Sequence, residues 1–544
     1  MAPGADAEDT GRKQFMPMTG AEVLVEGLMA AGAKHLFSLS GNQILSVYDA
    51  TIGRDIELIH TRHEAAAVHM ADGWGRLTEE PGVALLTAGP GHCNGLTALY
   101  VALMAESPLL MLSGHCPEAQ IGKGAFQEID QAAAARPVSK ASWRVERSDD
   151  LESDLYRALE MAVSGRPGPV HLSLPSDVLE ASAGRSRNAP SKGADGAVTG
   201  DLEGVLALLS RADRPLILAG PAMGRGQRWL AVEALADVTG IPALPMESPR
   251  GVNDPALRRA AACLASADVL LLLGKKLDFS LRFGQRPFFS EQRRFIQIDA
   301  DQSELRDHDG MTLRHCADPW EATRRLVEMA RERTWNSGSW RSDVDSLRVA
   351  APAEWDGLLR PAASPVHPLG VCEAVQPFLD DGAILVNDGG EFGQWAQAGL
   401  AAEIRLINGP SGAIGSALPM GLAAKLAFPD RTVFVFLGDG TFGYHAMELD
   451  TALRYGLPVV AIVGNDARWN AEHVLQVETY GSDRTIGCDL LDTKYDRVTE
   501  ALGGYGVFVD RAEDLPDALN DAVASGLPAC VNVAIEPAAA PAFC

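Results

Sequence analysis

Two polar motifs, each directly after an apolar run, are the residues whose types and spacing most clearly predict chemistry. The tetrapeptide 438–441 (Gly-Asp-Gly-Thr) follows the apolar residues 433–437, and Asn465 follows the next such run, residues 459–463. Runs that are apolar at consecutive positions are typical of strands in a parallel sheet covered on both faces. The carboxyl ends of such strands meet at one edge, where open α/β sheets bind their ligands. The two motifs are therefore expected to lie close together.

The oxygen atoms expected at this edge are of the kind that Mg²⁺ binds. The Asp439 carboxylate, the Asn465 side chain and the backbone carbonyl of Ala467 offer hard oxygens. Mg²⁺ takes a few such ligands and completes its octahedron with phosphate oxygens and water. Gly438 and Gly440 let backbone N–H groups approach a diphosphate closely. The alternative is an ordinary tight turn after a strand, which is weakened because the second motif arrives at the end of the next strand.

This pair of motifs resembles the signature of the thiamine-diphosphate (ThDP) enzyme family, in which Gly-Asp-Gly is followed, some two dozen residues later, by Asn-Asn or Asn-Asp. By that resemblance Asp439, Asn465 and the Ala467 carbonyl hold Mg²⁺ on the cofactor diphosphate. The similarity extends along the chain to residues 62–76 and 411–415. The cofactor contacts that it implies are Glu64, Pro90, Asn94, Gly389, Gly390, Glu391, Gly412, Ile414, Gly438, Asp439, Gly440, Thr441 and Asn465.

Glu64 matches the glutamate that, in this family, hydrogen-bonds N1′ of the cofactor aminopyrimidine. The chemistry requires such a group, because ThDP loses its C2 proton to its own 4′-imino group and that tautomer is accessible only when N1′ is protonated. A carboxylic acid in an apolar pocket can share its proton with N1′. By itself Glu64 also fits an ordinary carboxylate in the first turn of a helix. In combination with the 438–441 motif, the catalytic role is favoured.

Residues 411–415 (Ser-Gly-Ala-Ile-Gly) match the segment that bends the cofactor in this family. The resemblance implies that Ile414 wedges between the two cofactor rings and that the Gly412 carbonyl accepts from the 4′-amino group. The same residues also fit a glycine-rich helix entry packed in a core, and both interpretations can hold. Residues 388–391 (Asp-Gly-Gly-Glu), after a predicted strand, lie where further diphosphate contacts are expected.

Residues 87–94 and 126–128 are similar to the acetolactate-synthase and benzaldehyde-lyase branch of the family, in which Gln127 would face the thiazolium as a second catalytic residue. Residues 273–278 and 297–301 resemble the middle domain of the same branch, where some members bind FAD and relatives bind ADP. FAD or ADP is disfavoured here because no complete dinucleotide fingerprint is present.

Three departures from the family pattern leave the substrate open. Ser40 stands where some carboligases carry a catalytic histidine, Asp466 replaces the usual second asparagine, and residues 468–473 match no familiar subfamily string. The expected activity is that of a lyase, decarboxylase or carboligase (a transferase) acting on small 2-oxo acids, 2-hydroxy ketones or aldehydes. The alternatives are a 2-hydroxyacyl-CoA lyase or oxalyl-CoA decarboxylase, and a family member without catalytic activity. The sequence assigns no role to Trp469, Asn470, Glu472 and His473.

The elements that must position these residues are short apolar runs alternating with alanine-rich segments, which predicts the α/β class with parallel sheets covered by helices. Strands are expected at residues 83–87, 109–112, 170–174, 216–219, 269–273, 295–298, 383–386, 433–437, 459–463 and 530–535. Helices are expected at residues 21–31, 64–77 and 422–428.

The first and last thirds of the chain follow one plan, because each has a strand, a glycine-rich turn and then a proline-led strand. Three domains are expected: a pyrimidine-binding domain at 16–182, a central Rossmann-like domain at 202–335, and a diphosphate- and Mg-binding domain at 368–544. A disordered leader is expected at 1–15, and exposed linkers at 183–201 and 336–367. Glu64 and the 438–441 motif fall in different domains. The resemblance therefore implies that the cofactor bridges two subunits of a homodimer or homotetramer.

The composition of the 544-residue chain excludes several classes of partner. It carries 72 acidic and 47 basic residues, a net charge of −25 at pH 7. Such a surface repels phosphate backbones and anionic headgroups, so neither nucleic acid nor a membrane is expected as a partner, and a small-molecule substrate is. No apolar run approaches the ~18 residues of a membrane span. The eight cysteines are scattered and form no CxxC pair, which fits a reducing cytoplasm.

Overall fold

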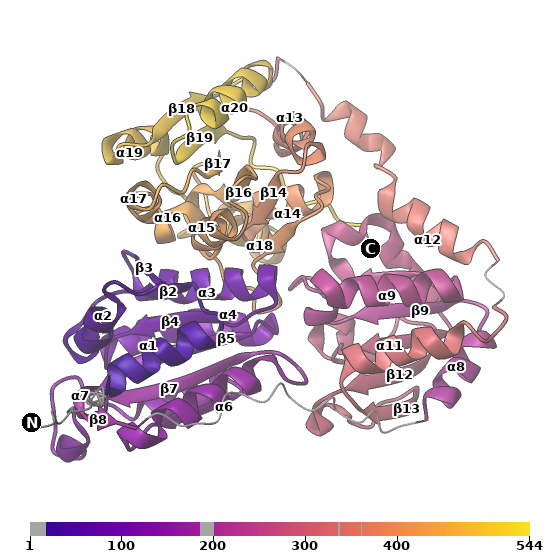
Figure 1. Ribbon diagram of the computed structural model, residues 1–544. Helices are drawn as coiled ribbons and strands as arrows, with labels where there is room; N and C mark the ends of the chain where they lie inside the picture. The colour runs from indigo at the N-terminus through magenta and orange to yellow at the C-terminus, as the bar shows by residue number, and fades with distance from the viewer. Residues whose placement is uncertain (1–17, 185–200, 336–337, 361, 544) are drawn as a thin grey trace, which may run out of the picture.

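The computed structural model describes residues 18–184, 201–335, 338–360 and 362–543, which form three domains built on parallel sheets (Figure 1). The predicted α/β class is therefore confirmed. In Figure 1 the last domain lies above the first, and the central domain lies beside both. The expected leader, residues 1–15, falls outside the described residues. None of the described helices is long and apolar enough to cross a membrane.

The first domain is built on a six-stranded parallel sheet with the order β3-β2-β4-β5-β7-β6. Its strands are β2 (His35–Ser38), β3 (Glu57–His60), β4 (Gly82–Leu86), β5 (Leu109–His115), β6 (Ala141–Arg144) and β7 (Pro169–Pro175). Its helices are α1 (Gly20–Ala30), α2 (Leu45–Thr51), α3 (Glu64–Thr78), α4 (Pro90–Met104), α5 (Gln131–Ala135), α6 (Leu151–Val163) and α7 (Ser176–Glu180). A separate antiparallel pair joins β1 (Met18–Thr19) to β8 (Ser182–Ala183).

The last domain repeats this topology strand for strand, with the order β15-β14-β16-β17-β19-β18. Its strands are β14 (Ile384–Asn387), β15 (Arg405–Ile407), β16 (Val433–Gly438), β17 (Val460–Asn465), β18 (Tyr505–Val509) and β19 (Ala529–Ala534). Its helices are α13 (Pro368–Asp380), α14 (Gly390–Gly399), α15 (Ala417–Ala427), α16 (Asp439–His445), α17 (Glu448–Arg454), α18 (Asn470–Tyr480), α19 (Tyr495–Leu502) and α20 (Leu515–Ala524). In both sheets the second strand of the chain lies outside the first, and the sixth lies inside the fifth.

The central domain has a five-stranded parallel sheet with the order β10-β9-β11-β12-β13. Its strands are β9 (Pro215–Ala219), β10 (Ala243–Pro245), β11 (Val269–Leu273), β12 (Arg294–Asp299) and β13 (Met311–Cys316). Its helices are α8 (Leu202–Ser210), α9 (Gly226–Thr239), α10 (Cys263–Ser266) and α11 (Pro319–Ala330). Two buried clusters, one on each face of this sheet, make its core.

The stretch 336–367, expected to be an exposed linker, contains helix α12 (Trp340–Val349), whose residues other than Val344 are exposed or half-buried. Val344 is fully buried and belongs to the core cluster on one face of the central sheet. The Trp340 indole donates to the Pro215 carbonyl at 2.8 Å. The helix forms because its apolar side chains cover that face. Most of the other expected linker, 183–201, lies outside the described residues.

Helix α3 of the first domain packs on α15 of the last domain, and their buried side chains form one continuous core. Gly73 makes this close approach of the two helices possible, because an added Cβ there would lie only 3.1 Å from the Met420 Cα. The carboxyl edges of both sheets are therefore held in fixed positions within one chain.

Candidate active site

A cavity of about 340 Å³ opens at the carboxyl edge of the last sheet. It lies where the strand order reverses, between β14 and β16, which is the position at which open α/β sheets bind ligands. Its walls come from the turns after β14, β16 and β17, from the loop before α15, and from one loop of the central domain. The predicted residues that line it are Gly389, Gly390, Glu391, Gly412, Ile414, Gly438, Asp439, Gly440 and Thr441.

Two carboxylates, Asp439 and Asp466, line this cavity from the ends of neighbouring strands. Asp439 is 2% exposed, and its Oδ2 has no hydrogen-bond partner among the described residues. Burial raises the pKa of Asp439 to about 6. Burial, and next the charge of Asp439, raise the pKa of Asp466 to about 7. Two neighbouring carboxylates that repel one another, one buried and one half-buried, are stabilised by a cation, which this part of the site can therefore accept.

Two glycines of the cavity wall stand where no side chain fits, so the backbone there can approach a bound group closely. An added Cβ on Gly440 would lie 2.6 Å from the Trp469 ring, and one on Gly389 would lie 2.9 Å from Ile414 Cγ2. Gly390 has a φ of +85°, a conformation that favours glycine, and it begins α14. The unpaired N–H groups and the dipole at the start of this ten-residue helix favour an anion such as a phosphate.

Asp388 fixes the loop that carries Ile414. Its buried carboxylate accepts the backbone N–H groups of Gly389 at 2.7 Å, of Gly415 at 2.9 Å and of Ala417 at 3.1 Å. Burial raises the pKa of Asp388 to about 6. Because one carboxylate joins the turn after β14 to the loop before α15, Ile414 is held against the first turn of α14.

Glu391 lines the same cavity, and two segments distant in sequence hold it. The backbone N–H of Ala540 donates to the Glu391 carboxylate, and the Arg250 guanidinium of the central domain lies 3.7 Å from it. Burial raises the pKa of Glu391. Nearby, the Asn470 amide donates to the Ala538 carbonyl at 3.3 Å. The chain after β19 therefore forms part of the site.

The structure does not bring Asn465 and Ala467 to this cavity. The Asn465 amide donates to the Thr493 carbonyl at 3.0 Å and to Asn532 Oδ1 at 3.2 Å. Asn465 Oδ1 accepts the N–H of Ala467 at 3.2 Å, and the Ala467 carbonyl accepts the N–H of Leu490 at 2.7 Å. The oxygens that the sequence offered as metal ligands are thus engaged in holding the segment after β17.

The predicted residues of the first domain form a second group. Glu64 begins α3, and the Asn94 amide donates to its Oε2 at 3.0 Å. Pro90 begins α4 and, like Asn94, is exposed. Gln127 lies half-buried in the loop after β5 and accepts from the Gln43 amide. None of the four predicted residues lines the cavity of the last domain.

Comparison with known proteins decides the family. Residues 18–134, 202–326 and 388–533 match the N-terminal TPP binding, central and C-terminal TPP binding domains of thiamine pyrophosphate enzymes. The chain is 34% identical over 537 residues to acetolactate synthase large subunit IlvG of Mycobacterium tuberculosis, which covers 96% of this chain and 97% of the relative. The chain belongs to the thiamine pyrophosphate enzyme family.

Other relatives of this thiamine pyrophosphate enzyme carry a different name. It is 31% identical over 575 residues to 2-hydroxyacyl-CoA lyase of Oryza sativa subsp. japonica, with 98% of each chain covered. It is 32% identical over 584 residues to 2-hydroxyacyl-CoA lyase 2 of Homo sapiens, with 95% of this chain and 90% of the relative covered. The protein is therefore a ThDP-dependent enzyme of the acetolactate synthase or 2-hydroxyacyl-CoA lyase type.

The residues of this enzyme fit a metal on the cofactor diphosphate, and one of the two carboxylates that fit it, Asp466, was not among the ligands expected from the sequence. The described residues contain no group of three or more His, Cys, Asp or Glu side chains that could hold a metal. Asp439 and Asp466 nevertheless fit Mg²⁺, which needs only one or two carboxylates when phosphate oxygens and water complete its shell. The alternation of side chains along a strand could have predicted that Asp466 lines the cavity. Successive side chains point to opposite sides, and Asn465 points to the side of Thr493 and Asn532.

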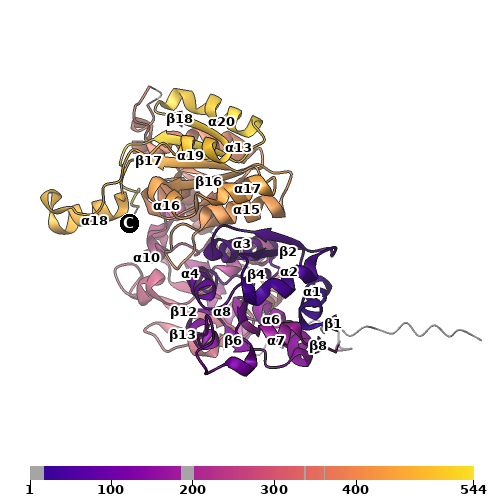
Figure 2. The same cartoon turned by 90° about the vertical axis from the view of Figure 1, so that its left-hand side faces the viewer.

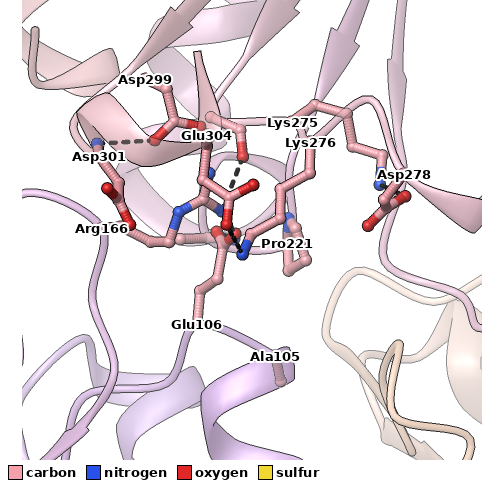
Figure 3. A network of polar contacts seen from close by, with 12 residues as sticks. Ala105, Glu106, Arg166, Pro221, Lys275, Lys276, Asp278, Asp299, Asp301 and Glu304 are labelled. Carbon is pink, nitrogen blue, oxygen red and sulfur yellow. Dashed lines mark hydrogen bonds and ion pairs between the residues drawn. The ribbon is translucent and has the colours of Figure 1, made fainter. Parts of the chain in front are cut away.

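The central domain of the thiamine pyrophosphate enzyme has a comparable sheet edge, and its polar groups are already paired (Figure 3). The Arg166 guanidinium, from the first domain, bridges the carboxylates of Glu106 and Asp299 and donates to the Gly274 carbonyl at 3.1 Å. Glu106 Oε2 accepts the N–H of Ala222 at 3.0 Å. Asp299 ends β12, and Ala222 and Gly274 follow β9 and β11, between which the strand order reverses.

This edge is the part of an open sheet that would receive the pyrophosphate and ribose of a dinucleotide. Here a carboxylate of the first domain already accepts the N–H of Ala222, and Arg166 already neutralises Asp299. As paired, these groups do not fit FAD or ADP. That a nucleotide is absent stays a prediction, and no step of the reaction is assigned to one.

Proposed function

We propose that this ThDP enzyme is a Mg²⁺-dependent lyase or carboligase that acts on small 2-oxo acids, 2-hydroxy ketones or aldehydes. The observation that carries the proposal is the pair of carboxylates, buried Asp439 and half-buried Asp466, beside a glycine-lined cavity at the switch point of the last sheet. When bound, ThDP supplies a carbon nucleophile and an electron sink for cleaving and forming C–C bonds. The chain has to hold it, orient it and keep water away.

Asp439 and Asp466 would hold the metal, in place of the Asn465 and Ala467 oxygens that the sequence offered. The N–H groups at the start of α14, beginning with Gly390, would hold the diphosphate. Ile414 lies against Gly389 on the same wall, where its branched side chain would fix the bend between the cofactor rings. This assignment uses each group in the orientation that the fold already gives it.

Glu64 would hold a proton on N1′ of the aminopyrimidine, with the Asn94 amide keeping its carboxylate in place. Because Glu64 does not line the cavity of its own last domain, we propose that it serves the site of a second copy, in a homodimer or homotetramer. Helix α18 stands away from the body of the chain in Figure 2, and its Leu475 and Tyr480 are 63% and 64% exposed. A second copy would cover these side chains.

The charges around the cavity favour a small substrate over an acyl-CoA. Four carboxylates line it, Asp439, Asp466, Glu391 and Glu472. Among the residues that the structure describes, only Arg250 and Arg468 supply positive charge to its walls. CoA carries several phosphate charges, which such walls repel. A 2-hydroxyacyl-CoA lyase or oxalyl-CoA decarboxylase is the second candidate, favoured by the similarity to relatives named 2-hydroxyacyl-CoA lyase.

A product panel tests the proposal and separates the two candidates. The protein loaded with ThDP and Mg²⁺ is incubated with 2-oxo acids, 2-hydroxy ketones, aldehydes and 2-hydroxyacyl-CoAs, and products are identified by mass spectrometry. We expect turnover of the small substrates. Turnover of the acyl-CoAs alone would transfer the proposal to the second candidate, and no turnover with bound cofactor would indicate a non-catalytic member.

The Glu64→Gln variant tests the catalytic assignment separately. It removes the proton-sharing carboxyl but keeps the size of the side chain, so we expect ThDP to bind while turnover falls at least about 100-fold, the lower end of the roughly 10²–10⁴-fold that general acid–base groups contribute. Circular dichroism follows cofactor binding. Unchanged turnover would remove Glu64 from the mechanism.

A further inference from the structure

Gln43, a residue without a role in the reaction as proposed, joins two segments of the first domain. It lies in the 3₁₀ turn Asn42–Ile44 that follows β2, and it is 8% exposed. Its Oε1 accepts from the Thr87 hydroxyl at 2.7 Å, and its Nε2 donates to Gln127 Oε1 at 3.1 Å. The strand order of the first sheet reverses between β2 and β4, and Thr87 follows β4. Gln43 and Thr87 therefore meet where an open sheet binds its ligand.

The packing around Gln43 leaves its side chain little freedom. An added Cβ on Gly114 of β5 would lie 2.8 Å from Gln43 Cβ, and one on Gly41 would lie 2.2 Å from Thr87 Oγ1. Both glycines are thus required for the turn after β2 to lie directly on β5 and on the end of β4. A glutamine confined in this way presents its amide in one orientation.

Gln127 is held equally firmly, in a backbone conformation that is rare for its type. Its φ is +59°, in the left-handed region that costs free energy for a residue with a Cβ. The Glu128 carboxylate closes the loop around it by accepting the N–H groups of Gly122 and, at 2.8 Å, of Ala125. An added Cβ on Gly89 would lie 2.7 Å from the Gln127 carbonyl oxygen, so the loop rests on the turn after β4.

A nearby glutamine shows what a purely structural amide looks like in this region. Gln131 Oε1 accepts the N–H of Gly89 at 2.9 Å, and its Nε2 donates to the Gly114 carbonyl at 3.0 Å and to Ser173 Oγ at 3.2 Å. Both ends of that amide are satisfied within the chain. For Gln127 only the oxygen is satisfied, by Gln43, and no described residue accepts from its Nε2.

We propose that Gln43 is a positioning residue that fixes which face of the Gln127 amide is presented to the substrate. By donating to Gln127 Oε1, Gln43 turns that oxygen inward and leaves the two N–H groups of Gln127 Nε2 available. The Thr87 hydroxyl donates to Gln43 Oε1, the arrangement in which Gln43 Nε2 is left to donate to Gln127.

Two available N–H donors recognise an oxygen acceptor, and they bind a carboxylate more strongly than a neutral group. The relay therefore selects a substrate with a carboxylate, such as a 2-oxo acid, over the corresponding aldehyde. This specificity rests on the proposed function and on the resemblance by which Gln127 faces the thiazolium, where the substrate reacts.

The Gln43→Glu variant tests the relay, because a carboxylate still accepts from Thr87 but cannot donate to Gln127. The holoenzyme is assayed with a 2-oxo acid and with the aldehyde that lacks its carboxylate. We expect kcat/KM for the 2-oxo acid to fall at least tenfold, mainly through KM, while kcat/KM for the aldehyde changes less than twofold. The exposed Gln120→Glu variant introduces the same charge in the same domain and should leave both values unchanged.

A double-mutant cycle separates positioning from a merely structural role. In a Gln127→Met background, which has no amide to orient, Gln43→Glu should cause less than a twofold further loss. Equal losses for both substrates, or losses that multiply in the double variant, would overturn the proposal.

A measurement on the protein without cofactor keeps this test independent of turnover. With ¹⁵N-labelled glutamine, the side-chain amide signal of Gln127, assigned by its loss in Gln127→Met, should shift in Gln43→Glu and stay in place in Gln120→Glu. An unshifted signal would overturn the relay. A shifted signal in an enzyme inactive on every substrate would instead contradict the proposed function alone.

Discussion

The carboxyl edges of the central and last sheets both carry buried carboxylates, and they differ in how the negative charge is met. At the central edge Arg166 bridges Asp299 and Glu106, which joins the first domain to the central one (Figure 3). At the last edge Asp439 and Asp466 lie close together, and no described residue forms an ion pair with either.

The difference shows that one sheet geometry can serve two purposes. A buried carboxylate must be paired, because leaving water costs a charge several kcal/mol or more. Where the chain supplies the cation, the edge becomes a joint between domains. Where it supplies only carboxylates and accessible N–H groups, the edge is suited to a metal and an anion from outside.

The largest effect is expected from removing the cation of the central edge. In Arg166→Met, Glu106 and Asp299 are left buried and unpaired, so the free energy of unfolding at pH 8 should fall by about 3–5 kcal/mol. Urea unfolding measures it. Arg324→Met, which removes an exposed partner of Glu321, is the control and should change it by less than about 1 kcal/mol. Equal effects of the two variants would mean that the joint contributes no special stability.

The destabilisation in Arg166→Met should grow with pH. Burial already raises the pKa of Asp299 while Arg166 lowers it, so without Arg166 the pKa rises further. A carboxyl whose pKa is higher in the folded than in the unfolded chain loses stability as pH rises from its unfolded value, about 4, toward the folded one. Unfolding at pH 5 and pH 8 should therefore show the smaller difference from wild type at pH 5, and a constant difference would contradict this origin.

At the last edge, removing a carboxylate should affect function and leave folding intact. Asp439→Asn takes away a metal ligand, and we expect activity to fall by more than the roughly 10–100-fold that changes around a metal's ligands cause. The stability of the cofactor-free protein should stay the same or rise, because repulsion between Asp439 and Asp466 is relieved. Turnover and thermal unfolding without cofactor measure the two effects. A large loss of stability would mean that Asp439 is structural.

Asp466→Asn and Asn465→Ala should separate the two candidate ligands. Asp466→Asn keeps an oxygen but loses a charge, so Mg²⁺ affinity in the presence of ThDP should weaken by about tenfold. Asn465→Ala removes hydrogen bonds to Thr493 and Asn532, so it should lower the free energy of unfolding by about 1–3 kcal/mol. Calorimetry and urea unfolding measure both. Loss of Mg²⁺ binding in Asn465→Ala at unchanged stability would restore Asn465 as the ligand.

The smallest effect is expected from the partly exposed charges of the central edge. Lys276 Nζ lies 2.6 Å from Glu304 Oε1, with both side chains in contact with water. Lys276→Met should lower the free energy of unfolding by no more than about 1 kcal/mol, because water screens the pair. A loss as large as that of Arg166→Met would show that burial does not govern this edge.

Strands covered on both faces were predictable from the sequence, whereas edge strands were not. The run expected at 269–273 is β11, and those expected at 433–437 and 459–463 are β16 and β17 within two residues at each end. The expected strands include none of the outermost strands of the three large sheets, which are β3, β6, β10, β13, β15 and β18, and among the inner strands only β2 was missed. An edge strand is paired on one side only and needs fewer apolar side chains, so it leaves no continuous apolar run.

The sequence by itself determined the fold class, the shared plan of the first and last domains and the motif at residues 438–441, because strand periodicity and glycine-rich turns are local properties. Only the tertiary structure decided that Asp466 and not Asn465 lines the cavity, since a shift of one residue along a strand reverses the side on which a side chain lies. It also decided that Arg166 pairs with Asp299, and that Gln43 reaches Gln127. These contacts join segments far apart in the chain, and they form only when the domains pack.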